Sequence, residues 1–177
     1  MARSAVLSEP VPGEDRAAMK KLEGKYLTFV LGEEEYGLDI TRVKEIIGVM
    51  EVTHLPKTPH FIKGVINLRG KVIPLIDLRL KFGMQEARYT RETVFIVVEV
   101  SGVQMGIIVD TVKEVLDIRA ADIEPPPKFG TRLTADFILG MGKVAGKVKI
   151  LLDIERVLTG EEAAMLSSLA ENMEDKP

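Results

Sequence analysis

The stretch GVINLRGKVIPLIDL, residues 64–78, decides the fold of this chain. Two apolar runs, Val65–Leu68 and Val72–Ile76, flank a short polar break. This alternation is typical of two strands that are joined by a tight hairpin. Gly70 can take a positive φ without steric cost, so the turn is predicted to close in about two residues and to leave Arg69 at an exposed tip.

A second copy of this stretch lies 76 residues further along the chain. Residues 137–154, FILGMGKVAGKVKILLDI, align without a gap to residues 61–78, FIKGVINLRGKVIPLIDL. Upstream, residues 105–116, MGIIVDTVKEVL, match residues 36–47, YGLDITRVKEII, at an offset of 69. The chain is therefore predicted to be a duplication of two β units that are related by a pseudo-twofold axis.

Three other segments carry local signals. Residues 1–22 mix charges, prolines and small residues without periodicity, so they are predicted to be a flexible tail with at most a short helix near residues 15–22. Residues 61–63 are expected to form one helical turn before the first hairpin. The seven extra residues of the second copy, 76 − 69, fall within residues 117–136, where three prolines at 125–127 predict a loop of polyproline character.

The two units give the chain its domain organisation. Repeat 1 spans about residues 25–83, and repeat 2 spans about residues 93–158. Thr159 and Glu162 have the spacing of a capping box, which predicts an amphipathic helix over about residues 161–173. Many short strands with glycine-containing turns are typical of small barrels, so the fold is predicted to be mainly β, with two barrels and a C-terminal helix.

Composition limits the possible functions. The chain has 177 residues, a formal net charge of −3 and no cysteine. Without cysteine there are no disulfides, thiolate zinc sites or cysteine nucleophiles, which suits a reducing cytoplasm. The interspersed charges argue against nucleic acid as a partner, and no apolar run approaches the roughly 18 residues that direct membrane insertion needs. The protein is therefore predicted to be soluble and cytoplasmic, without a metal or cofactor.

The repeat raises one enzymatic hypothesis. Asp77 and Asp153 are equivalent in the two copies, so a pseudo-symmetric β protein could bring their carboxylates together as an aspartate hydrolase does. Both lack the Asp-Thr/Ser-Gly sequence of aspartic proteases, and a role in capping the turn after a strand is the stronger interpretation. His54 and His60 have no metal-binding spacing or nucleophile motif nearby and are interpreted as loop residues.

Two charged positions are candidates for contact with a partner. Glu45 and Glu114 occupy equivalent places in a Val-Lys-Glu sequence, which fits a solvated strand face as well as an interface. Arg69 has Ala145 as its equivalent in the second copy. An arginine at the hairpin tip in one half only is compatible with a partner-facing role, because arginine is enriched at binding hot spots.

Taken together, these segments resemble the CheW family, adaptor proteins that couple chemoreceptors to the histidine kinase CheA in bacterial chemotaxis. The resemblance covers about residues 25–169 and departs mainly in the tail, so residues 23–177 are expected to form a CheW-like domain. It implies two SH3-like five-stranded β-barrels around a shared core, in agreement with the repeat. It rests on YLTFVLGEEEYGLDITRVKEI, LPKTPHFIKGVINLRGKVIPLIDLRLKFG, GIIVDTVKEVL and ILGMG followed by KILLDIERVL.

The resemblance also implies a function. Members of the family are non-enzymatic scaffolds that bind the cytoplasmic tip of methyl-accepting chemoreceptors between the barrels and the regulatory domain of CheA through barrel ends, with possible ring assemblies. Carried over by position, the receptor-binding residues would be Val43, Glu45, Asn67 and Arg69. Gly64 matches a position tied to the kinase or another partner, and a structural role for this glycine fits equally well.

Two alternative functions stay open at this point. One is a CheW-like adaptor for a kinase pathway outside chemotaxis, such as surface motility or second-messenger control. The other is the hydrolase that would use Asp77 and Asp153, which requires their carboxylates to lie within hydrogen-bonding distance.

Overall fold

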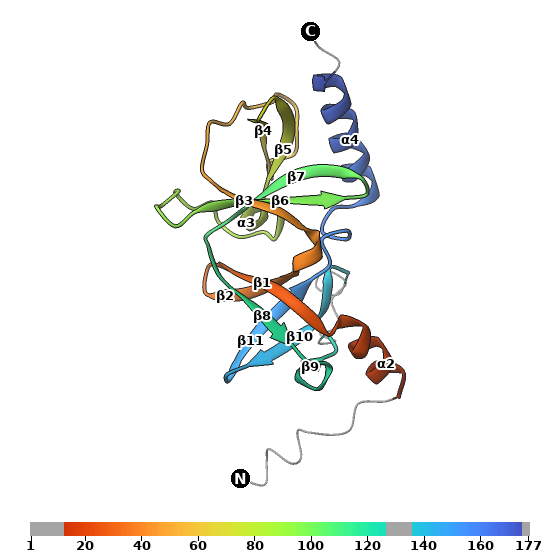
Figure 1. Cartoon of the computed structure of the whole chain (residues 1–177). Helices are drawn as coiled ribbons and strands as arrows, with labels where there is room; N and C mark the ends of the chain where they lie inside the picture. Colours follow the sequence, from red (N-terminus) through yellow and green to blue (C-terminus); the bar gives the residue numbers. More distant parts are fainter. Residues whose placement is uncertain (1–12, 127–135, 175–177) are drawn as a thin grey trace.

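The computed structural model describes residues 13–126 and 136–174 of the chain. Its strands form two sheets, each rolled into a small SH3-like barrel, and the barrels lie one above the other in Figure 1. Helix α4 (Gly160–Glu174) lies beside the upper barrel, and helix α2 (Gly13–Leu22) lies at the far end of the lower one. The prediction of a mainly β protein with two SH3-like barrels and a C-terminal helix is confirmed. One barrel has six strands and not the expected five, because a two-residue strand pairs with its edge.

The lower barrel in Figure 1 is six-stranded, with the strand order β8-β1-β2-β11-β10-β9. All neighbours pair antiparallel except β11 and β2, which are parallel. The strands are β1 (Gly24–Leu31), β2 (Glu34–Asp39), β8 (Thr111–Ile118), β9 (Ile123–Glu124), β10 (Ile138–Val144) and β11 (Lys147–Leu152).

The upper barrel is five-stranded, with the order β3-β6-β7-β5-β4 and a parallel pair between β5 and β7. An antiparallel bridge between Thr53 and Val65 ties the chain after β3 to β4, the other edge strand. This bridge occupies the place that β9 has in the six-stranded barrel. The strands are β3 (Val43–Gly48), β4 (Ile62–Leu68), β5 (Lys71–Asp77), β6 (Val94–Val100) and β7 (Val103–Val109).

The two repeats exchange strands, which the sequence did not predict. The six-stranded barrel takes β1 and β2 from repeat 1 and its other strands from repeat 2. The five-stranded barrel takes β6 and β7 from repeat 2 and its other strands from repeat 1. The chain crosses between the barrels through the short 3₁₀ helix η1 (Ile40–Arg42) and through Asp110, which alone separates β7 from β8. Each repeat therefore contributes to both barrels.

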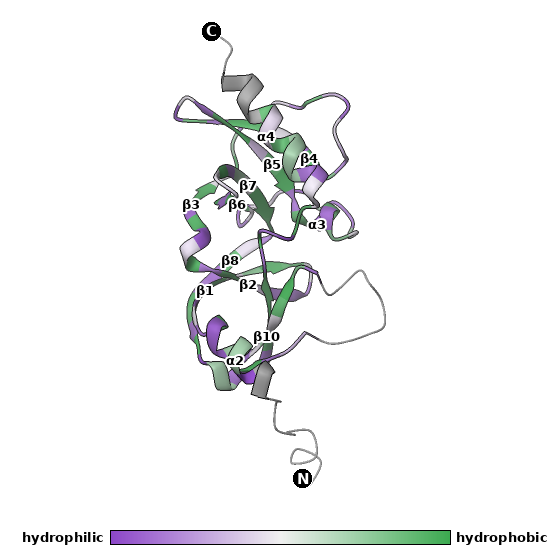
Figure 2. Ribbon diagram, turned by 90° about the vertical axis from the view of Figure 1, so that its right-hand side faces the viewer, coloured by the Kyte–Doolittle hydropathy of each residue, from purple (hydrophilic) through white to green (hydrophobic). Residues whose placement is uncertain are grey.

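The largest hydrophobic core is shared by the two barrels. It joins buried side chains of β1 and β2, such as Phe29 and Leu38, to those of β6 and β7, such as Ile96 and Ile107. A smaller core around Phe95 fills the inside of the five-stranded barrel, and another fills the inside of the six-stranded barrel. Figure 2 shows the hydrophobic residues concentrated in the strands. The shared core makes the pair of barrels one packed unit.

Both copies of the hairpin have the predicted two-residue turn. Arg69 and Gly70 adopt φ values of 53° and 88°, and their equivalents Ala145 and Gly146 adopt 53° and 77°. These angles are typical of a type I′ turn, whose twist matches that of the flanking strands. The capping box before α4 is also confirmed, since the backbone N–H of Glu162 donates to Thr159 Oγ1 at 3.2 Å.

The structure corrects the prediction of a flexible tail for residues 13–22, although the short helix expected near residues 15–22 is present. Residues 13–22 form α2, in which Met19 is only 5% exposed and packs with Tyr26 and Ile118 in the core of the six-stranded barrel. The hydroxyl of Tyr26 also donates to the carbonyl of Leu22 at 2.5 Å. The sequence analysis missed this contact because the segment has only weak hydrophobic periodicity, with Met19 and Leu22 as the residues that pack on the core. Residues 1–12 lie outside the described part of the chain.

Two further predictions need correction. Residues 61–63 are not helical, because β4 already begins at Ile62 and the carbonyl of Phe61 accepts the N–H of Asp77 at 2.8 Å. The segment 117–136 is not simply a loop, since β8 runs to Ile118 and is followed by η2 (Ala120–Asp122) and β9. Pairing with β10 accounts for β9. The last of the three prolines lies outside the described residues.

Candidate partner-binding site

The two charged candidate residues, Glu45 and Arg69, lie where the five-stranded barrel closes. Glu45 is on β3 and Arg69 is at the tip of the β4–β5 hairpin, on opposite edges of the same sheet. Rolling the sheet brings these edges together, and Arg69 Nη2 donates to Glu45 Oε1 at 2.9 Å and to Oε2 at 2.5 Å. We call this pair, with its hairpin, the closing seam of the five-stranded barrel.

The closing seam faces water. The side chain of Arg69 is 71% exposed, while that of Glu45 is 27% exposed. The hydrogen bond from Arg69 lowers the pKa of Glu45 below its ordinary value, and the same bond raises the pKa of Arg69. Both groups therefore stay charged at neutral pH, and their mutual attraction is screened by solvent.

The other two candidate receptor-binding residues lie near this pair. Asn67 is exposed, and its Oδ1 accepts the N–H of Gly70 at 2.7 Å, which holds the turn. Val43 is half-buried at the start of β3 and packs against the shared core. The structure thus brings Glu45 and Arg69 into contact and places Asn67 on the same hairpin, whereas Val43 lies further inward towards the junction of the barrels.

Gly64 has a structural role in this fold. It is buried with a φ of 142°, and a Cβ at this position would lie 2.1 Å from the carbonyl oxygen of Thr53. Thr53 and Val65 exchange both backbone hydrogen bonds here, each at 2.8 Å. A Cβ at the equivalent Gly140 would lie 2.9 Å from the carbonyl oxygen of Glu124. A glycine is needed at both places because two backbones approach closely.

The sequence analysis missed two exposed apolar residues beside the closing seam. Ile46, next to Glu45 on β3, is 44% exposed, and Val49, just beyond this strand, is 42% exposed. Val115, the equivalent of Ile46 on β8, is 49% exposed as well, so an exposed apolar residue at this place is common to both barrels. The only signal in the sequence was that Ile46 and Ile47 are adjacent in a strand, so both cannot point inward.

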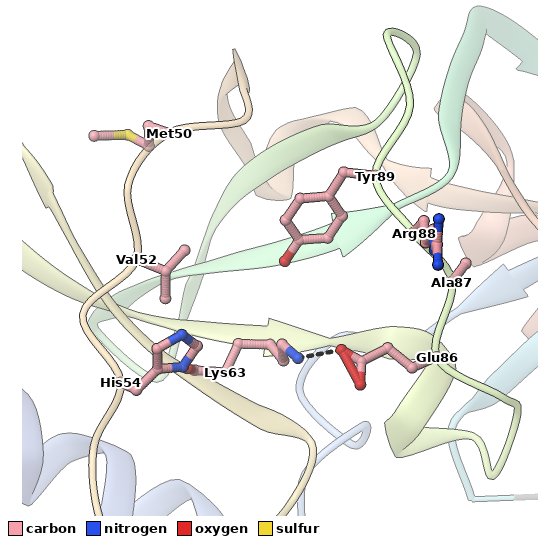
Figure 3. Close-up of a pocket in the computed structure, with 8 residues that line it drawn as sticks. All are labelled: Met50, Val52, His54, Lys63, Glu86, Ala87, Arg88 and Tyr89. Atoms are coloured by element: carbon pink, nitrogen blue, oxygen red, sulfur yellow. Dashed lines mark hydrogen bonds and ion pairs between the residues drawn. The ribbon is translucent and has the colours of Figure 1, made fainter.

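A shallow pocket of about 580 Å³ opens next to this surface, between the chain after β3 and the chain before β6 (Figure 3). Lys63 on its floor forms an ion pair with Glu86, and the hydrogen bond to Glu86 raises the pKa of Lys63. Tyr89 points into the pocket and packs edge-on against Phe95. The wall is completed by Met50, Val52, His54, Ala87 and Arg88.

The two equivalent aspartates cap separate turns, as predicted. Asp77 Oδ1 accepts the N–H of Leu80 at 3.2 Å and begins α3 (Leu78–Lys81), while Asp153 Oδ1 accepts the N–H of Glu155 at 3.0 Å. Burial raises the pKa of Asp77. Over residues 13–126 and 136–174 there is no cluster of three metal-ligating side chains and no helix long and apolar enough to cross a membrane.

These features define a class of mainly β proteins in which two SH3-like barrels share one core and exchange strands. A family model described as the CheW-like domain matches residues 25–162. A chemotaxis protein CheW of Klebsiella aerogenes is 43% identical over 88% of this chain and 97% of its own length. The chain therefore belongs to the CheW family.

Two other relatives agree with this assignment. The chemotaxis protein CheW of Treponema pallidum is 34% identical over 81% of this chain and 86% of its own. The crystal structure of the scaffolding protein TtCheW from Thermoanaerobacter tengcongensis has a TM-score of 0.73 and 39% identity, and the match covers 79% of this chain and 95% of that one. The two-barrel fold is thus shared with a solved member of the family.

Proposed function

We propose that this protein is a non-enzymatic chemotaxis scaffold that couples chemoreceptors to the histidine kinase CheA. Membership of the CheW family supports this proposal, as do the names of the relatives, which are chemotaxis and scaffolding proteins. In this role the chain works in the cytoplasm and is recruited to receptor arrays, in which it forms rings with CheA.

The observation that carries the proposal is the closing seam of the five-stranded barrel. An exposed arginine with a carboxylate partner is present in one barrel, and the equivalent tip of the other barrel carries Ala145. Because Ala145 supports the same turn, the hairpin itself does not require Arg69. A charged group that the fold does not need is a candidate for recognition of a partner.

The receptor-binding surface in this proposal consists of Val43, Glu45, Asn67 and Arg69. Glu45 and Arg69 supply charge at the exposed end, and Asn67 holds the hairpin in position. Val43 reaches towards the junction of the barrels. The exposed apolar residues Ile46 and Val49 lie beside this surface. Gly64 supports partner binding by keeping this barrel closed.

A titration of the protein with a receptor signalling-tip fragment and, separately, with a CheA regulatory domain tests this function. Arg69→Ala should weaken receptor binding by about tenfold or more, as expected for an interface anchor. Lys147→Ala, at an exposed position of the equivalent hairpin, is the matched control and should bind as the unmodified protein does. Lack of binding to both fragments by the unmodified protein would reject the proposal.

A further inference from the structure

Asp110 joins the two barrels at the crossing from β7 to β8. Its carboxylate accepts from Arg79 twice, from Nε at 2.7 Å and from Nη2 at 2.6 Å. Asp110 Oδ2 also accepts the N–H of Gly32 at 2.8 Å. Arg79 follows β5 of the five-stranded barrel, whereas Gly32 is in the β1–β2 turn of the six-stranded barrel. We call this set of contacts the Asp110 clamp.

Glu155 makes a corresponding set of contacts on the other side. Arg42, at the crossing from β2 to β3, donates from Nη1 to Glu155 Oε2 at 2.7 Å. Ser101, in the β6–β7 turn, donates its N–H to Oε2 at 3.3 Å and its hydroxyl to Oε1 at 2.9 Å. Glu155 follows β11 of the six-stranded barrel, so these contacts, the Glu155 clamp, also join the two barrels.

The two clamps are pseudo-equivalent but have opposite charges. Arg79 and Glu155 are 76 residues apart and occupy the same place in the two repeats. At the crossings, Arg42 of repeat 1 aligns with Thr111 at the offset of 69. Arg42 and Asp110 therefore lie at the same crossing of their repeats, one position apart in the alignment. The duplication thus placed an arginine after the last strand and an arginine at the crossing in repeat 1. Repeat 2 has Glu155 at the position equivalent to Arg79, and Asp110 at its crossing, directly before Thr111.

This pattern distinguishes between two ways of assembling the barrels. Without exchange, β1 and β2 would pack with β3, β4 and β5 of their own repeat, in the place that β6 and β7 occupy. The crossing that carries Arg42 would then lie beside Arg79, and the crossing that carries Asp110 would lie beside Glu155. Both encounters would join like charges, while the observed exchange joins opposite charges at both places.

We propose that Arg42, Arg79, Asp110 and Glu155 are positioning residues that select the exchanged pairing of the two repeats. The partial burial of the Asp110 clamp strengthens this selection, since the side chains of Arg79 and Asp110 are only 21% and 25% exposed. The inference depends on the fold alone. Only its consequence for receptor binding between the barrels rests on the proposed function.

A pair of introduced cysteines reports which arrangement is present, because the chain has no cysteine of its own. In the exchanged fold Lys25 on β1 lies opposite Asp117 on β8, and both side chains are more than half exposed. Without exchange Lys25 would face Gly48, the equivalent of Asp117 in repeat 1 at 117 − 69. A short bismaleimide crosslink between Lys25→Cys and Asp117→Cys therefore marks exchange, and one between Lys25→Cys and Gly48→Cys marks its absence.

The decisive variant is Arg79→Glu combined with Glu155→Arg. It leaves the net charge unchanged but makes both clamps repulsive in the exchanged fold and attractive in the other. We expect the monomer to lose most of the crosslink between positions 25 and 117. Adding Arg42→Asp and Asp110→Arg makes both clamps attractive again with reversed signs, and this fourfold variant should recover that crosslink. Receptor binding should be lost and recovered in parallel.

The alternative explanation is that the short crossings alone enforce the exchange. In that case the double variant would crosslink between positions 25 and 117 as fully as the unmodified chain, and the proposal would be overturned. If circular dichroism shows that the double variant does not fold, the fourfold variant decides: recovered folding with the crosslink supports the proposal, and continued failure overturns it. Loss of receptor binding in the fourfold variant with its crosslink intact would count against the proposed function instead.

Discussion

The closing seams of the two barrels share a backbone but differ in their side chains. In both, a two-residue turn with positive φ ends the hairpin, and a buried glycine lets the neighbouring chain approach. The five-stranded barrel adds the pair of Glu45 and Arg69, while the equivalent positions of the other barrel carry Glu114 and Ala145. The turn and the buried glycine are therefore what both barrels need in order to close, whereas the pair of Glu45 and Arg69 is an addition to the surface of one barrel.

The largest effect on this comparison is expected from Gly64→Val. A Cβ would lie 2.1 Å from the carbonyl oxygen of Thr53, at a φ of 142°. The substitution should lower the free energy of unfolding by more than about 3 kcal/mol, because two backbones must separate. Gly140→Val should cost less, since its contact is 2.9 Å and involves no positive φ. Urea unfolding of both variants measures the difference, and equal losses would contradict it.

The barrels also differ in how their ends are covered. Met19 of α2 packs into the core of the six-stranded barrel. Met19→Ala should lower the free energy of unfolding by about 2–3 kcal/mol, the usual cost of truncating a buried methionine. Ala18→Ser, on the exposed face of the same helix, serves as the control. A thermal midpoint of Met19→Ala equal to that of the control would show that the helix is not anchored.

The shared turn geometry predicts similar losses in the two hairpins. Gly70→Val and Gly146→Val place a β-branched residue at a φ of 88° and 77°, with open space around both positions. Each should cost about 1–3 kcal/mol from backbone strain alone. Calorimetry on the two variants checks this. A loss confined to one hairpin would mean that the turns are not equivalent.

The Asp110 clamp should make stability depend on pH. Burial raises the pKa of Asp110, but hydrogen bonds from Arg79 and Gly32 outweigh this and hold it below the ordinary value of 3.8. A lowered pKa contributes stability that is present above pH 3.8 and is lost as the pH falls through the folded-state value. Asp110→Asn should therefore flatten the acid side of the curve of unfolding free energy against pH. If the slope of this curve stayed unchanged, protonation of Asp110 would make no contribution to acid unfolding.

The smallest effect is expected from Ala145→Arg, which gives the second hairpin the residue that the first one has. The turn already accepts arginine at a φ of 53° in the first copy, so the melting temperature should stay the same. Receptor affinity should also stay the same, because the proposed surface lies on the other barrel. A gain in affinity would show that any tip arginine suffices, and that the position of Arg69 carries no specificity.

Much of this fold could be predicted from short stretches of sequence. The hairpins with Gly70 and Gly146, the capping box at Thr159 and the cap at Asp77 depend on residues within a few positions of one another. Local propensity and side-chain chemistry determine such features. The repeat added the pseudo-symmetry and the candidates Glu45 and Arg69, and the resemblance added the family and the candidates Val43, Asn67 and Gly64.

The sequence by itself thus determined the hairpins, the caps and the duplication, and the tertiary structure decided how they combine. Exchange of strands, the burial of Met19 and the contact between Glu45 and Arg69 each join residues that are distant in the chain. No local pattern encodes them, because a strand satisfies its hydrogen bonds equally well with either repeat. In the proposal made here, the choice between repeats falls to the charges of Arg79 and Glu155, which differ between two otherwise similar halves.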